Sequence, residues 1–288
     1  MKHFTLHKPN LKHIPFLMPG LAGVLIFILI PFIDSVRRSF CAAITGEFIG
    51  FHNFSIIFEN EAFTLAVKNT VLFTVVCLPL LIIISFFISY ALCKLKYIRL
   101  IKSILLFPLA VPTATLVFVW YILFDDAGYI NSVIIGCGGE KISFLHSMAA
   151  FWVLTGSYIW KNLGYTVLLW LTGILLGGLQ SVNKQYYDAA KVDGANERQC
   201  LFCIILPNLK PTLYTITIIS FLNSFKVFRE AYLVAGSYPH DSIYLLQHLF
   251  NNWFVNMELD KMAAAAVCVF GVVFLAIVLL QRVWDKES

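Results

Sequence analysis

Three charged residues and an asparagine interrupt an apolar stretch in the second half of the chain, and two of the four could line a path for a polar solute. They are Asn223, Lys226, Arg229 and Glu230, in the run SFLNSFKVFREAYLV. Ionisable groups within membrane spans are costly and are functional candidates by default. Lys226 and Glu230 stand four residues apart, so on a helix they can form an ion pair. Two readings stay open. In the first, Asn223 and Lys226 border a polar cavity. In the second, the Lys226–Glu230 ion pair simply ends the helix while Arg229 extends toward water.

A second group of side chains combines aromatic faces with hydrogen-bonding groups. It consists of Trp160, Lys161, Asn162 and Tyr165, in the run GSYIWKNLGY. Aromatic faces with a few polar groups suit a hydroxyl-rich solute such as a sugar. Trp and Tyr also gather at membrane–water interfaces, and that explanation serves equally well here. If the two groups line a path, their composition suits a hydroxyl-rich solute.

Motifs for catalysis, nucleotide binding and metal binding are missing from the sequence. It has no G-x-x-x-x-G-K-[ST] phosphate loop, no G-x-S-x-G and no H-E-x-x-H. The histidines are scattered, and Cys200-x-x-Cys203 has metal or redox spacing but no second pair to complete a site. We therefore expect no catalytic residue, no metal site and no cofactor bound by this chain.

The elements that must position these residues are membrane helices. Of 288 residues, 59% are hydrophobic and 13% are charged, whereas about a quarter are charged in a soluble domain. Roughly 20 apolar residues in a helix cross the hydrocarbon core of a bilayer. The apolar runs predict one all-α membrane domain over residues 1–288, with six spans at about 14–33, 69–93, 103–124, 153–176, 211–234 and 262–281.

The distribution of Lys and Arg predicts the orientation of these spans. Most Lys and Arg residues fall on the side that holds both chain ends and the run KLKYIRLIK. Cytoplasmic loops of membrane proteins are the ones enriched in Lys and Arg. Both termini are therefore expected in the cytoplasm. The net charge of +5 follows from this bias and implies no nucleic-acid partner. The first apolar run is too long for a signal peptide and lacks a cleavage site, so we expect it to be retained.

One polar stretch, residues 183–207, differs from the apolar spans on both sides of it, and we call it the signature loop. A helix over 184–193 is expected to end at Gly194 in a left-handed conformation. Asn196 and Gln199 have the spacing of a capping box at the start of the next helix. On these grounds alone the loop is either a well-capped connector or a docking surface for another protein.

The signature loop resembles the E-A-A-x3-G-x9-I-x-L-P signature of membrane subunits of ATP-binding-cassette importers, with Asp in place of the usual Glu. The matching residues are Asp188, Ala189, Ala190, Gly194, Ile204, Leu206 and Pro207. Other runs, among them AVKNTVLFTV and LFPLAVPTATLVFVWYILFDDAGYIN, look like their counterparts in the sugar-importer branch of maltose and glycerol-phosphate type. The N-terminal segment looks more like the first of the two permeases of such importers than the second.

This resemblance implies a type I importer permease fold and a permease function in carbohydrate import. It implies that the loop forms a coupling helix that docks on an ATPase through Asp188, Ala189, Ala190, Asp193, Gly194, Ala195, Ile204, Leu206 and Pro207. The implied partners are a second permease, two ATPase subunits that bind ATP and Mg²⁺, and an extracytoplasmic solute-binding protein. The implied location is a bacterial cytoplasmic membrane, crossed several times. The identity of the carbohydrate stays open.

A secondary transporter for a polar solute is the alternative reading. Such a transporter would be expected to show internal repeats and carboxylates within its spans. The sequence shows no internal repeat, and Glu230, near the edge of a span, is its one acidic residue within a span. A membrane-embedded enzyme is disfavoured because the catalytic motifs are missing.

Overall fold

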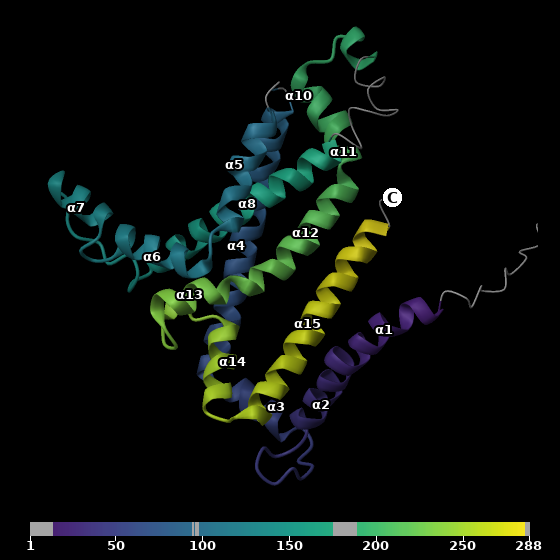
Figure 1. The fold of residues 1–288 in the computed structure, drawn as a ribbon, viewed down its shortest axis with the longest axis vertical. Helices are drawn as coiled ribbons and strands as arrows, with labels where there is room; N and C mark the ends of the chain where they lie inside the picture. The colour runs from purple at the N-terminus through teal and green to yellow at the C-terminus, as the bar shows by residue number, and fades with distance from the viewer. Residues whose placement is uncertain (1–13, 94, 96–97, 175–188, 286–288) are drawn as a thin grey trace, which may run out of the picture. The chain divides into compact units, whose positions relative to one another are not determined.

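The protein divides into two compact helical units. A computed structural model describes residues 14–93, 95, 98–174 and 189–285, and the regular elements among them are helical, as the sequence predicts, apart from one isolated β-bridge. Met1–Asn60 and Trp253–Val278 form the first unit, and Glu61–Asn252 and Leu279–Ser288 form the second. Figure 1 shows the elements of both units, which are described separately below.

The first unit is built on long apolar helices and a short folded segment. Its elements are α1 (Ile14–Val24), a π-helical turn η2 (Leu25–Leu29), α2 (Ile30–Ser39), α3 (His52–Glu59) and α15 (Leu259–Asp285) as far as Val278. The ring centroids of Phe32 in α2 and Phe270 in α15 lie 4.9 Å apart. The buried amide of Asn53 donates to the carbonyl oxygens of Ser39 at 3.1 Å and Cys41 at 3.0 Å. This side chain therefore fixes the chain where it leaves α2.

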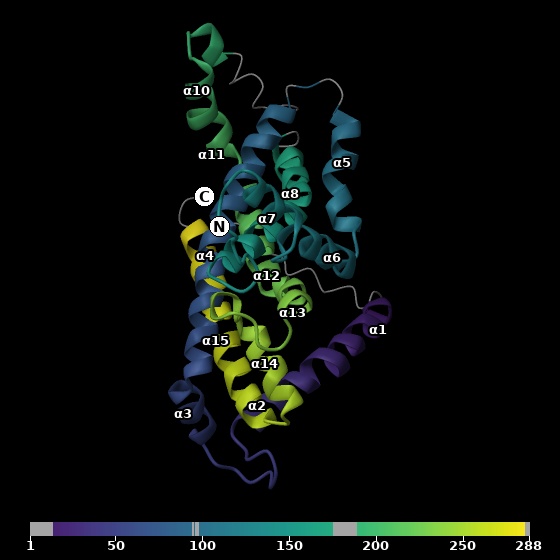
Figure 2. The same cartoon turned by 90° about the vertical axis from the view of Figure 1, so that its left-hand side faces the viewer.

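The second unit is a helix bundle centred on α4 and α8. Its elements are α4 (Glu61–Leu92), α5 (Ile98–Ala110), α6 (Thr113–Phe124), α7 (Tyr129–Gly136), α8 (Ala149–Ile174), α10 (Glu197–Cys200), η4 (Leu201–Ile205), α11 (Leu206–Asn208), α12 (Lys210–Ser224), η5 (Phe225–Val227), α13 (Phe228–Ala235), η6 (Asp241–Ile243) and most of α14 (Leu246–Val255). Helix α8 packs against α4, α5 and α12, and α13 packs against α6. Figure 2 shows α4, α8 and α12 running alongside one another, with α10 beyond one end of them.

Polar contacts between backbones and side chains tie these helices together. The hydroxyl of Ser89 in α4 donates to the carbonyl of Val167 in α8 at 2.9 Å. The hydroxyl of Tyr158 in α8 donates to the carbonyl of Ser220 in α12 at 3.0 Å. Between helices in a membrane, where burial of apolar surface does not drive association, hydrogen bonds of this kind help to hold the bundle together.

A single glycine sets the distance between α5 and α8. A Cβ atom at Gly164 would overlap the carbonyl oxygen of Leu105. The two backbones therefore touch directly, and no larger residue fits at position 164 without moving α5. Small residues at helix–helix contacts in membranes serve this purpose.

The predicted spans are only partly reproduced as single helices. Four described stretches are long and apolar enough to cross a bilayer, namely Phe16–Ser39, Glu61–Leu92, Thr113–Gly136 and Leu259–Trp284, and a fifth qualifies if Glu197–Asn208 and Lys210–Ala235 are taken as one span bent by 67°. The predicted span 103–124 is divided, because α5 ends at Ala110 and α6 begins at Thr113. Pro112 lies at the break with a ψ of 140°, and proline also disfavours helix at the preceding residue. The count of six spans and the location of the termini stay predictions.

Candidate functional site

The turn in the signature loop has the conformation predicted for Gly194, whose φ is +84°. The N–H of Ala195 donates to the carbonyl of Ala190 at 2.9 Å, and the N–H of Gly194 donates to the carbonyl of Lys191 at 3.1 Å. These two bonds form a Schellman motif, which ends a helix with a left-handed residue. Because residues with a Cβ adopt this φ at a cost, the turn depends on glycine.

The capping box predicted after the turn is also present. The N–H of Gln199 donates to Oδ1 of Asn196 at 2.9 Å, and the N–H of Asn196 donates to Oε1 of Gln199 at 2.8 Å. Two backbone donors at the start of α10 are thereby satisfied by side chains. The Schellman motif and the capping box occupy consecutive residues, so hydrogen bonds within the segment set the shape of residues 190–199.

Burial divides the signature residues into an exposed tip and an anchored base. At the tip, Ala189, Asp193 and Gly194 are exposed, and Ala190 and Ala195 are half-buried. The tip also presents Val192, which is 88% exposed. Asp188 lies outside the described residues. An exposed apolar side chain on a rigid turn is a feature of protein-binding surfaces.

At the base, the signature residues contact the bundle. Leu206 packs against a buried cluster that includes Trp170 and Ile216, Ile204 is half-buried, and Pro207 is exposed in the first turn of α11. Leu209 follows with 1% exposure, at the point where the chain bends by 67° into α12. The base therefore fixes the direction in which the tip projects, which Figure 1 shows as α10 standing beyond the ends of α4 and α8.

Lys161 and Glu230 form an ion pair between α8 and α13, 69 residues apart in sequence. The Lys161 ammonium also donates to the hydroxyl of Thr113, the first residue of α6, at 3.3 Å. The side chains of Lys161 and Glu230 are 22% and 8% exposed. We call these three residues the ion-pair cluster. A buried charge pair with a further hydrogen bond holds three helices in one arrangement.

The predicted pairing of Lys226 with Glu230 is wrong. Lys226 is exposed and donates to Oδ1 of Asn223 at 3.0 Å, whereas Glu230 is buried against α8. The 3₁₀ turn η5, Phe225–Val227, interrupts the α-helix between them. Because a 3₁₀ helix has three residues per turn rather than 3.6, the four-residue spacing no longer keeps both side chains on one face.

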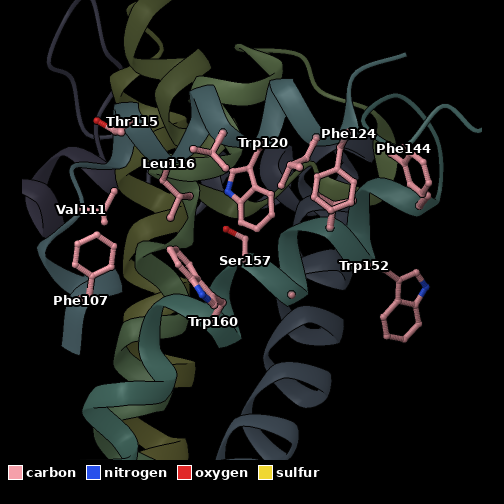
Figure 3. Close-up of a pocket in the computed structure, with 15 residues that line it drawn as sticks. Phe107, Val111, Thr115, Leu116, Trp120, Phe124, Phe144, Trp152, Ser157 and Trp160 are labelled. Atoms are coloured by element: carbon pink, nitrogen blue, oxygen red, sulfur yellow. The ribbon is translucent and has the colours of Figure 1, made fainter. Parts of the chain in front are cut away.

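The aromatic and amide residues predicted around Lys161 do not converge on one site. Trp160 faces Trp120 of α6, with ring centroids 6.5 Å apart. The amide of Asn162 donates to the carbonyl of Tyr158 in its own helix at 2.8 Å, and Tyr165 is 37% exposed. Trp160 instead borders a pocket of about 960 Å³ between α5, α6 and α8, where Figure 3 shows it with Trp120 and Ser157.

The sequence interpretation missed Thr113 and the true partner of Lys161. The break at Pro112 was visible in the sequence, and it places Thr113 at a helix start where its hydroxyl is near α8. The cost of an acidic residue within a span marks Glu230 in the sequence, but sequence spacing alone points to a partner on the same helix. The contact that forms joins two helices distant in sequence.

Comparison with known proteins identifies the family. The family of binding-protein-dependent transport system inner membrane components matches residues 94–287, which include the signature loop. The chain belongs to this family. It is a membrane-embedded permease component of an ATP-binding-cassette importer and works in transport, not as an enzyme.

Several curated relatives are permeases of sugar transport systems. The chain is 29% identical to the sulfoquinovosyl glycerol transport system permease SmoG of Agrobacterium fabrum, over 81% of this chain and 75% of the relative. It is 28% identical to the arabinooligosaccharide permease AraP of Bacillus subtilis, over 92% of this chain and 84% of the relative. It is 26% identical to the trehalose/maltose permease MalF of Thermococcus litoralis, over 92% and 93%.

Solved structures share the fold. A chain of a bacterial ABC transporter involved in the import of the acidic polysaccharide alginate superposes with a TM-score of 0.81 at 20% identity, covering 95% of this chain and 94% of that one. A chain of the alginate transporter in complex with a pentasaccharide-bound periplasmic protein superposes with a TM-score of 0.74 at 21% identity, covering 93% and 92%.

Proposed function

We propose that this permease forms, together with a second permease, the translocation path for a carbohydrate. An extracytoplasmic binding protein delivers the solute, and two ATPase subunits that bind ATP and Mg²⁺ drive transport from the cytoplasmic side of a bacterial membrane crossed several times by this chain. The sugar transport systems named for the relatives support carbohydrate as the solute class, and the complex of the alginate transporter with its periplasmic protein supports delivery by a binding protein.

The observation that carries this proposal is the division of the signature loop into an exposed tip and an anchored base. A mere connector would need neither a fixed turn nor a rigid projection. Here the Schellman motif at Gly194 and the capping box at Asn196 fix the tip, and Leu206 anchors the base in the bundle. A small, rigid, projecting surface is suited to insertion into a groove on an ATPase.

The solute path is proposed to run past the two polar groups of the second unit. Asn223 and Lys226 are joined by a hydrogen bond on the α12–α13 helix, and the ion-pair cluster lies where α6, α8 and α13 meet. Beyond the bond that joins them, Asn223 and Lys226 carry further hydrogen-bonding groups that suit hydroxyl groups, whereas Lys161 and Glu230 neutralise each other.

Purification of the chain with and without candidate partners tests this proposal. The isolated chain should hydrolyse no ATP, and co-expression with a second permease and the ATPase should give a complex whose ATP hydrolysis rises when solute-loaded binding protein is added. ATP hydrolysis by the isolated chain would contradict the assignment of energy supply to a partner. If no ATPase co-purifies with a chain whose signature loop is unchanged, the docking role is contradicted.

Thiol labelling from outside the cell tests the orientation. In a variant whose own cysteines are replaced by serine, a cysteine introduced at Ile44, which is 98% exposed, should react with a membrane-impermeant reagent, and one at Val192 should not. Reaction at Val192 alone would place the loop on the wrong side of the membrane for contact with a cytoplasmic ATPase.

A further inference from the structure

Three polar residues share the accessible side of the helix that runs from α12 through η5 into α13, which Figure 1 shows following one another along the chain. They stand at intervals of three residues, and we call them the cationic strip: Asn223, Lys226 and Arg229. Lys226 and Arg229 are exposed, and Asn223 is half-buried. The buried side repeats at the same interval, at Ser224, Val227 and Glu230. The 3₁₀ turn η5 accounts for both rows, because side chains three residues apart eclipse one another in such a helix.

The hydrogen-bonding groups left on the cationic strip are almost all donors. The Lys226 ammonium and the Arg229 guanidinium can only donate, and Oδ1 of Asn223 already accepts from Nζ of Lys226 at 3.0 Å. A ligand group that only accepts, such as a carboxylate, a sulfonate or a phosphate, matches these donors. The hydroxyl groups of a neutral sugar also need acceptors, and the strip supplies few of them.

The two positive charges of the cationic strip have no counter-ion in the part of the chain that the structure describes. The carboxylate expected to neutralise Lys226 was that of Glu230, which binds Lys161 of α8 instead. Lys226 has Asn223 as its hydrogen-bond partner, and Arg229 has none among the described residues. The strip is therefore free to bind an anion from outside the chain.

The predicted orientation places the cationic strip in the outer half of the membrane. Counted from the start of the predicted span 211–234, Asn223 lies about 18 Å and Arg229 about 27 Å along the helix at a rise of 1.5 Å per residue. The hydrocarbon core is about 30 Å thick. The preference of Lys and Arg for the cytoplasmic side does not explain cations at this depth. Charged residues within spans mark solute pathways, and an exposed row of them fits such a pathway.

We propose that the carbohydrate carried by this permease bears an anionic group, and that the cationic strip binds this group. The Arg229 guanidinium and the Lys226 ammonium form charge-assisted hydrogen bonds to it, and Asn223 holds Lys226 in place through the bond between them. The inference rests on the proposed function and narrows its solute class to carbohydrates that carry a carboxylate, a sulfonate or a phosphate.

Chemical modification of Arg229 tests this inference without ATP. The permease is purified with the subunits that remain bound, placed in nanodiscs of phosphatidylcholine and treated with p-hydroxyphenylglyoxal, which modifies arginine. The rate at Arg229 is followed by peptide mass spectrometry, with the exposed Arg282 of α15 as the internal reference. The anionic probes are digalacturonate and glucose 6-phosphate, and their neutral counterparts are digalacturonate dimethyl ester and glucose. At least one anionic probe should slow the reaction at Arg229 about fivefold or more, whereas the neutral counterparts should leave it unchanged.

A matched pair of lysine substitutions separates the cationic strip from the general charge of the protein. Lys226→Gln removes one of the two charges of the strip and should reduce the protection of Arg229 about threefold or more. Lys68→Gln makes the same change at an exposed lysine of α4 and should leave the protection unchanged. Equal protection in both variants and the native chain would show that Lys226 is not part of the site.

Three further outcomes would overturn the inference. Neither anionic probe protects Arg229, or the neutral counterparts protect it equally, which would make hydroxyl groups rather than charge the recognised feature. In the third, phosphatidylglycerol added to the nanodiscs shields Arg229 while the carbohydrates do not, which would make the strip a site for a lipid headgroup. Each of these outcomes leaves the proposed function standing with a neutral solute. Conversely, failure of the assembled importer to couple ATP hydrolysis to solute counts against the proposed function and does not alter the protection measured at Arg229.

Discussion

The two ends of the second unit are stabilised in opposite ways. At the signature loop, the hydrogen bonds that set the shape join residues three to five apart, and the side chains of the tip are exposed. At the other end, Glu230 binds Lys161 from 69 residues away, and both are largely buried. Changes at the loop should therefore alter docking with little effect on folding, whereas changes at the ion-pair cluster should alter folding itself.

The largest effect on stability is expected at Glu230. Glu230→Leu leaves the Lys161 ammonium without its carboxylate, and breaking a buried ion pair costs about 3–5 kcal/mol. We expect about 3 kcal/mol, because Lys161 keeps 22% exposure. Thermal unfolding of the purified protein measures the loss. The double variant Lys161→Met/Glu230→Leu should recover most of it, and a double variant as unstable as the single one would show that the pair is not the source.

The next effect is expected at Gly194 and concerns docking. Gly194→Val forces a β-branched residue to a φ of +84°, at a cost on the order of 1–3 kcal/mol that the loop avoids by changing shape. Co-purification of the ATPase and solute uptake should both fall at least about 10-fold, with the melting temperature nearly unchanged. Gly194→Asn is the matched control, since asparagine tolerates this conformation. Equal docking by both variants and the native chain would make the loop a simple connector.

A smaller effect, dependent on pH, is expected at His248 in α14. The side chain is fully buried beside the rings of Phe228, Tyr232 and Tyr244, and this burial lowers the pKa of His248 to about 4. An unfolded histidine has a pKa of about 6.5. Between these values the unfolded chain binds a proton that the folded chain does not, so the free energy of unfolding should fall as the pH is lowered, by up to ~1.4 kcal/mol per pH unit.

Melting temperatures from pH 7.5 to pH 5 test this effect. His248→Asn retains an acceptor for the N–H of Leu245, which donates to Nδ1 of His248 at 3.2 Å, and should flatten the decline below pH 6.5. An equally steep decline in this variant would assign the pH dependence to other groups.

The smallest effect is expected at the capping box. Asn196→Ala removes the acceptor for the N–H of Gln199, which costs about 1 kcal/mol of local helix stability. Affinity for the ATPase should fall about fivefold through loosening of the tip. Asn196→Ser, which preserves a cap, should bind like the native chain. If a titration finds the same affinity for the ATPase in Asn196→Ala and Asn196→Ser, the capping box does not contribute to docking.

The same contrast explains how much of the structure the sequence could predict. The turn at Gly194 and the capping box at Asn196 depend on bonds within a few residues, so local rules were sufficient there. The partner of Glu230 depends on how α8 and α13 pack and on the phase change at η5, neither of which has a local signal. The break at Pro112 lies between these cases. Proline at position 112 is a signal for a helix break, but the apolar residues on both sides of it favour the prediction of one continuous span.

The bend at Leu209 joins two helical arms of unequal length. The arm from Glu197 to Asn208 has 12 residues and the arm from Lys210 to Ala235 has 26, and they meet at 67°, which gives lengths of about 18 Å and 39 Å. If the pair turns as a rigid body about the buried Leu209, a 3 Å displacement at the short end rotates it by about 10° and carries the long end, with Glu230 near it, about twice as far. Because the long arm is about twice the length of the short one, a small displacement of the short arm would reach the Lys161–Glu230 pair as a larger displacement.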